Sequence, residues 1–82
     1  MPFTMSVMAT ELDGRLLNRI RVARAEHDLS QDQLAWAAGV SRQTISSIET
    51  RQYCPSTLLA FRLARVLDVR VDELFWLEGE DR

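Results

Sequence analysis

The feature that most constrains the fold is a turn of three residues, Gly39-Val40-Ser41, between two segments with helical periodicity. Ser30 begins an S-x-x-Q capping box, a pattern typical of a helix start. Gly39 predicts where this helix ends, because glycine readily adopts the left-handed conformation found just after many helices. Ser41 predicts the cap of a second helix, which extends to Glu49. So short a connection cannot lay two helices side by side, and we expect them to cross steeply.

The rest of the chain also favours helices, because its apolar residues recur at spacings of three and four. It has no run of alternating β-branched residues, so we expect no strands. The expected helices cover about residues 12–27, 31–38, 42–49, 57–67 and 73–77, with Asp72 capping the last. Their inward apolar residues form the expected core: Leu16, Ile20, Ala23, Leu34, Ala35, Ala38, Val40, Ile45, Ile48, Leu59, Ala60, Leu63, Ala64, Leu67, Leu74 and Phe75, with Leu17 as a further candidate.

The length of 82 residues suffices for one modest core and not for two. A hydrophobic fraction of 46% with 27% charged residues is ordinary for a globular domain. We therefore predict a compact, all-α, five-helix domain over residues 12–77. Residues 1–11 are expected to form a flexible N-terminal arm, and residues 78–82 an acidic tail.

The distribution of charge is more informative than the net charge of −2. Residues 1–70 carry nine arginines against seven acidic residues, and the acidic excess lies in residues 71–82. The predicted helical domain is therefore mildly basic over most of its length, which is compatible with nucleic-acid binding.

The second helix of the pair has a polar outer face. Ile45 and Ile48 are expected to point inward, which leaves guanidinium, amide and hydroxyl groups outside. Arginine can bond to O6 and N7 of guanine, glutamine to N6 and N7 of adenine, and hydroxyls to base edges or phosphates. These residue types predict a DNA-reading surface: Arg42 and Gln43 on bases, with Thr44, Ser46 and the amide of Gln31 on phosphates.

From Asn18 to about Leu77 the chain resembles the phage-repressor and Cro-like helix-turn-helix family, also called the xenobiotic-response-element family. The resemblance rests on NRIRVAR, LSQDQLAWAAGVSRQTISSIE, PSTLLAFRLARVLDV and DELF, in one continuous register. It implies a lambda-repressor-like domain whose helix-turn-helix covers residues 31–50 and which binds double-stranded operator DNA. By position it implies base contacts from Arg42, Gln43 and Ser47, a phosphate contact from Gln31, and an Arg24–Glu49 ion pair that helps Arg24 to face a phosphate.

Two positions depart from the family pattern. Arg51 stands where relatives usually carry a glycine, and a left-handed conformation there costs about 1 kcal/mol. We predict that Arg51 gains a phosphate contact in exchange. Ser47 is shorter than the basic or amide side chain of many relatives, so base reading is expected to depend mainly on Arg42 and Gln43.

A set of apolar residues is left over once the core is filled, and such a set suggests an interface. We predict a homodimer whose interface includes Leu58, Phe61, Trp76 and Leu77. A dimer reads two half-sites about 34 Å apart, so the expected function is a repressor acting on a palindromic operator. Two alternatives remain open: an antitoxin-type module of a two-gene pair that also binds its own promoter, and a helical interaction domain that has lost DNA binding.

Other function classes find little support in the sequence. With one histidine, the chain offers no nucleophile, base and orienting acid for catalysis. No apolar run approaches the roughly 20 residues of a membrane helix. The single cysteine, Cys54, cannot form an intramolecular disulfide. We expect a cytoplasmic, nucleoid-associated protein that is not an enzyme and that uses no metal, cofactor or small-molecule ligand.

Overall fold

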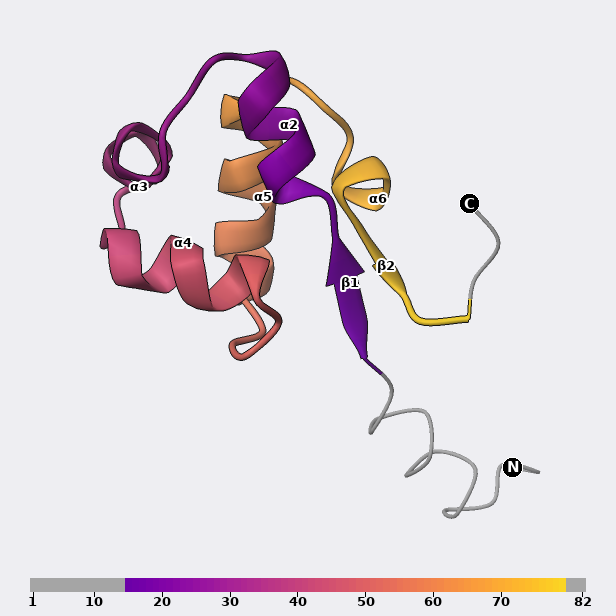
Figure 1. Cartoon of the computed structure of the whole chain (residues 1–82). Coiled ribbons are helices and arrows are strands. Elements are labelled where there is room, and N and C mark those ends of the chain that lie inside the picture. Colours follow the sequence, from indigo (N-terminus) through magenta and orange to yellow (C-terminus); the bar gives the residue numbers. More distant parts are fainter. Residues whose placement is uncertain (1–14, 80–82) are drawn as a thin grey trace, which may run out of the picture.

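The structure, a computed structural model, describes residues 15–79, in which five helices and two short strands occur (Figure 1). In chain order the elements are β1 (Leu16–Asn18), α2 (Ile20–Glu26), α3 (Gln31–Ala38), α4 (Arg42–Glu49), α5 (Thr57–Val66), α6 (Val71–Leu74) and β2 (Phe75–Leu77). The predicted five-helix domain is confirmed. Residues 1–11, predicted as a flexible arm, and residues 80–82 of the predicted tail lie outside the described residues.

Serine caps begin three of the helices. The hydroxyl oxygens of Ser30, Ser41 and Ser56 each accept a hydrogen bond from the backbone N–H three residues later. At α3 the capping box is complete, because the Gln33 side chain also accepts from the Ser30 N–H at 2.8 Å. These caps satisfy N–H groups that have no partner inside the helix. All three predicted starts are confirmed.

Four helices end in the same way, with one residue in the left-handed conformation. These residues are Asp28, Gly39, Arg51 and Asp68, with φ values of 59°, 78°, 65° and 56°. After each of them, the next N–H bonds to the carbonyl oxygen five residues earlier, at 2.8–3.0 Å. This is the Schellman motif, which pairs the last carbonyl groups of a helix and turns the chain sharply. Of the four residues that adopt the left-handed conformation in these motifs, only Gly39 is a glycine.

The core lies between α5 and the elements around it. Figure 1 shows α5 behind α2, with α3 and α4 on one side and α6 and the two strands on the other. The buried residues are Ile20, Ala23, Leu34, Ala35, Ala38, Ile45, Ile48, Leu59, Leu63, Ala64, Leu67, Leu74 and Phe75, and each was predicted to be in the core. Leu16, Val40 and Ala60 are partly buried against it.

The two strands correct the prediction for both ends of the domain. β1 pairs with β2 in antiparallel register, with Leu17 opposite Trp76. The first helix therefore starts at Ile20 instead of residue 12, and the last helix ends at Leu74 instead of Leu77. The expectation of no strands was wrong because three-residue strands are too short to show alternation, and their pairing depends on closure of the whole chain.

The predicted cap of the last helix was also wrong. α6 begins at Val71, and the capping position is Arg70 instead of Asp72. The Glu73 carboxylate reaches back to accept from the Arg70 N–H at 2.9 Å. Asp72 instead pairs with the Arg70 guanidinium, with 3.0 Å between Oδ1 and Nε.

Candidate nucleic-acid interface

The angle between α3 and α4 is set by the turn at Gly39. Its φ of 78° allows the Val40 N–H to bond to the Ala35 carbonyl at 3.0 Å, and Ser41 caps α4 two residues after Gly39. A Cβ added at Gly39 would meet the Arg62 Nη1 atom at 3.8 Å, which is ordinary contact. The position therefore favours glycine for its backbone conformation and not for lack of space.

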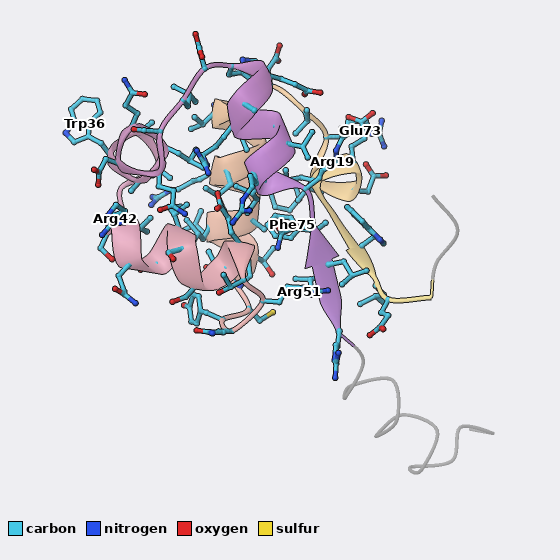
Figure 2. All side chains as sticks on the ribbon, in the orientation of Figure 1. Arg19, Trp36, Arg42, Arg51, Glu73 and Phe75 are labelled. Atoms are coloured by element: carbon cyan, nitrogen blue, oxygen red, sulfur yellow. The ribbon has the colours of Figure 1, made fainter. Side chains whose placement is uncertain are left out.

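Burial divides α4 into two faces. Ile45 and Ile48 are completely covered by the core. Arg42 and Gln43 are exposed on the opposite side, and Figure 2 shows Arg42 at the start of the helix. The three hydroxyl residues of the predicted surface, Thr44, Ser46 and Ser47, are half-buried. We call Gln31, Arg42, Gln43, Thr44, Ser46, Ser47 and Arg51 the reading face.

A buried carboxylate joins α2, α3 and α4. The Glu49 side chain is 2% exposed, and its Oε2 lies 2.7 Å from the Arg24 Nε atom. Its Oε1 accepts from the Arg24 Nη2 at 3.3 Å and from the Gln31 Nε2 at 3.0 Å. Arg24 also donates from Nη1 to the Leu29 carbonyl at 2.8 Å, so its guanidinium is held on two sides. The structure thus brings together Arg24 and Glu49, the ion pair that the family resemblance implied.

The same network extends to Arg42. The Gln31 Oε1 atom accepts from the Arg42 Nη1 at 3.5 Å, and the Asp32 Oδ1 lies 3.6 Å from the Arg42 Nε. Arg42 is therefore positioned by the first turn of α3, although its side chain remains 61% exposed. Gln31 contacts both the buried Glu49 and the exposed Arg42, so it links the interior to the reading face.

The loop after α4 contains a further cation, Arg51, whose side chain lines a hollow together with Asn18 and Phe75. Arg51 is exposed, has a positive φ and lies beyond the C-terminal end of α4 (Figure 2). The Ser47 carbonyl accepts from the N–H groups of Gln52 and Tyr53 at 2.8 and 3.2 Å, which folds the loop back on the helix. The Thr50 hydroxyl bonds to the Ser46 carbonyl at 3.0 Å. These bonds fix the path of the loop through Tyr53.

The comparisons with known proteins agree with this geometry. The pattern of the Helix-turn-helix family matches residues 20–74, most of the chain. The chain belongs to the helix-turn-helix family. It is 38% identical over 64 residues to YgzD, an uncharacterised HTH-type transcriptional regulator of Bacillus subtilis, which covers 78% of this chain and 97% of the relative. The resemblance to Cro-like helix-turn-helix proteins that the sequence indicated is confirmed.

Two solved structures have the same fold. One is a DNA-binding protein described from Bacteroides fragilis, with a TM-score of 0.68 and 33% identity over 74% of this chain and 98% of that one. The other is the restriction-modification controller protein C.AhdI from Aeromonas hydrophila, with a TM-score of 0.65 and 34% identity over 68% of this chain and 85% of that one. The prediction of a DNA-binding regulator that is not an enzyme is confirmed at the level of the family.

Asn18 is a structural residue of the helix-turn-helix domain that the sequence analysis missed. Its Nδ2 donates to the Ile48 carbonyl at the end of α4 at 3.0 Å. Its Oδ1 accepts from the Ile20 N–H at the start of α2 at 3.1 Å. One amide therefore satisfies the start of α2 and the end of α4, and its bond to Ile48 spans 30 residues of the chain. The available signal was the residue type, because an Asn side chain readily accepts a hydrogen bond from the backbone N–H two residues later.

The apolar residues predicted as a dimer interface of this helix-turn-helix domain are not all on one surface. Leu58 and Phe61 are 62% and 57% exposed and share a face of α5, because they are three residues apart. Trp76 and Leu77 are consecutive in β2, so their side chains point to opposite faces of the sheet. Trp76 shares its face with its cross-strand neighbour Leu17. The structure therefore brings together Leu58 and Phe61, and separates Trp76 from Leu77.

A hollow beside Phe61 is lined by both apolar and charged residues. They come from α5, α6 and the connection between them, and they include Phe61, Val71, Arg65, Arg70 and Asp72. The hydrogen bond that the Arg70 guanidinium donates to Asp72, together with the negative charges of Asp72 and Glu73, raises the pKa of Arg70 above its ordinary value. The surface around Phe61 thus combines apolar and charged side chains, as protein interfaces commonly do.

Within residues 15–79 the structure contains neither a candidate metal site nor a candidate membrane-spanning helix. In that range no group of three or more His, Cys, Asp or Glu side chains is placed to hold a metal ion. None of the helices described there is long and apolar enough to cross a membrane.

Proposed function

We propose that this protein binds double-stranded DNA sequence-specifically, with α4 in the major groove. The observation that carries the proposal is the division of α4: Ile45 and Ile48 anchor one face in the core, while Arg42 and Gln43 are exposed on the other. A helix held in this way presents a guanine-binding and an adenine-binding side chain side by side. Ser47 is half-buried and short, so in this proposal it contributes a secondary base contact.

Phosphate contacts are proposed around the base-reading pair. Gln31 lies beside α4, in contact with both Arg42 and Glu49, and Arg51 follows the end of α4. Thr44 and Ser46 are on the helix itself. Arg24 keeps N–H groups beyond the three it uses on Glu49 and Leu29, which it can offer to a phosphate. Contacts of this kind fix the register of the protein on DNA and do not read its sequence.

The proposal extends to a homodimeric transcriptional repressor acting on a palindromic operator in the cytoplasmic nucleoid. A single reading helix contacts only a few base pairs, and two copies related by a two-fold axis read two half-sites. The exposed Leu58 and Phe61 support this assembly, because an apolar pair on a small domain is a candidate for burial against a second copy. A dimer that occupies a promoter would block transcription by its presence alone.

Selection of bound duplexes from a random pool tests the proposal. We expect a palindromic consensus, and we expect Arg42→Ala/Gln43→Ala to lose retention of the selected duplex while its thermal unfolding stays cooperative. The control Arg19→Ala removes an exposed arginine just before α2, outside the reading face and the Phe61 surface, and should retain the duplex. Binding should also weaken steeply with salt, since phosphate contacts release counterions. If the double variant bound the selected duplex as tightly as the wild type, the reading face would be assigned wrongly.

A further inference from the structure

An acidic residue lies at the edge of the reading face. Asp32 is in the first turn of α3, its side chain is 79% exposed, and its Oδ1 is 3.6 Å from the Arg42 Nε. A negative charge beside a DNA-binding arginine costs affinity, because nearby phosphates repel it within a Debye length of roughly 8–10 Å. One ordinary role for such a residue is the favourable interaction of an acid with the start of a helix. Its contact with Arg42 indicates a second role.

The geometry of the guanidinium shows what this contact does. Asp32 faces the Nε atom, and Gln31 accepts one hydrogen bond from Nη1 at 3.5 Å. An arginine has five N–H donors, so at least three remain, including both of those on Nη2. The Asp32 carboxylate lies beside Nε at ion-pair distance, so a base that approaches side-on through Nε and Nη meets a negative charge. The end of the guanidinium, where Nη1 and Nη2 lie side by side, can still donate to O6 and N7 of guanine.

We propose that Asp32 is a specificity-determining residue, which positions Arg42 for guanine and disfavours binding to other DNA. This inference rests on the proposed function of the reading face. Asp32 limits the rotamers of Arg42 in the free protein, so less side-chain entropy is lost when the guanine contact forms. It also opposes the loose phosphate contacts that Arg42 would otherwise make on any sequence. Both effects raise the ratio of specific to non-specific affinity.

The test compares five proteins on three kinds of duplex at one fixed salt concentration. Three of them are the wild type, Asp32→Asn and Arg42→Ala. The fourth is the double variant Asp32→Asn/Arg42→Ala, and the fifth is the control Asp68→Asn, which removes an exposed carboxylate at the far end of α5. The duplexes are the one selected by the wild type, its single-base-pair variants, and a scrambled duplex. Asp32→Asn keeps the side-chain shape and removes the charge, and thermal unfolding checks that it folds.

We expect Asp32→Asn to lose discrimination at the same base pair as Arg42→Ala, by roughly threefold to tenfold. It should bind the scrambled duplex more tightly than the wild type does, and Asp68→Asn should match the wild type on every duplex. In an Arg42→Ala background, Asp32→Asn should change discrimination at that base pair no further. A purely structural role of Asp32 would not single out one base pair.

Two results would overturn the inference in distinguishable ways. If the wild type discriminates between bases and Asp32→Asn has the same profile, or is relaxed equally at every position, Asp32 does not act through Arg42. If the wild type itself shows no preference among the duplexes, the proposed function fails, and the role of Asp32 fails with it.

Discussion

At the scale of single residues, Arg51 adopts a left-handed backbone conformation that is unfavourable for a long side chain. Asp28 and Asp68 adopt the same left-handed backbone, but a short polar side chain tolerates it better than a long one does. Glycine, which has no such cost, occupies the equivalent place at Gly39. Arg51 therefore costs stability, and in our proposal its exposed guanidinium offsets that cost by contacting a phosphate.

Arg51→Gly should separate stability from binding. Relief of the left-handed conformation is expected to raise the free energy of unfolding by about 1 kcal/mol. For a domain of this size that is roughly 4–8 °C in Tm, measured by thermal denaturation. The same change should weaken binding to the selected duplex. It should also lower the salt dependence of that binding by the amount expected for about one phosphate contact.

The matched variant Arg51→Gln removes the charge and keeps the strained conformation. It should lose DNA affinity to the same extent as Arg51→Gly without becoming more stable. Full affinity in either variant would contradict the proposed phosphate contact, and a stability gain in the glutamine variant would contradict the conformational explanation.

At the scale of elements, three helices meet at Glu49. Glu49→Ala removes a buried acceptor and leaves the 15%-exposed Arg24 side chain without its counter-charge. We expect a loss of about 3 kcal/mol in the free energy of unfolding, measured by urea denaturation. The double variant Arg24→Met/Glu49→Leu replaces both charges with apolar side chains, and it should be more stable than Glu49→Ala alone. If both variants lost the same free energy of unfolding, the loss would come from altered packing and not from the unpaired charge of Arg24.

The helix ends show how far elements can be predicted from the sequence. The starts at Ser30, Ser41 and Ser56 were correct because a cap is a local contact between residues three positions apart. The start of α2 was not, because it depends on Asn18, whose amide also needs the Ile48 carbonyl from a distant helix. Local signals predict local bonds, and a bond across 30 residues gives no local signal.

At the scale of the whole molecule, assembly is proposed to depend on the apolar face of α5. Phe61→Glu should give a monomer in sedimentation at micromolar concentration and should weaken operator binding at least about tenfold, because the two half-sites are no longer linked. The fold should survive, since Phe61 is 57% exposed and the new carboxylate lies four residues before Arg65.

Trp36→Glu is the matched control, because it also replaces an exposed aromatic side chain with a carboxylate. Trp36 is 86% exposed on α3, where Figure 2 shows it pointing away from the bundle. This variant should remain a dimer. Dissociation of Trp36→Glu but not of Phe61→Glu would move the interface to α3.

The sequence by itself determined the helix-turn-helix and which of its residues face the core and which face outward. The spacing of Ile45 and Ile48, the serine caps and Gly39 all act over a few residues, so the pattern was sufficient to place the two helices and to leave Arg42 and Gln43 outside. Most of the thirteen buried residues were predictable for the same reason, since helical periodicity sorts inward from outward positions; Phe75 is the exception, because it is buried in β2 and not on a helix.

Only the tertiary structure decided what surrounds that pair of helices. The pairing of β1 with β2, the Asn18 bridge and the contacts of Gln31 and Asp32 with Arg42 join residues from different elements. Their existence depends on the angle at which elements meet, and spacing along the chain does not encode that angle. Periodicity indicates which side of a helix is buried, whereas packing decides which neighbour each polar side chain meets.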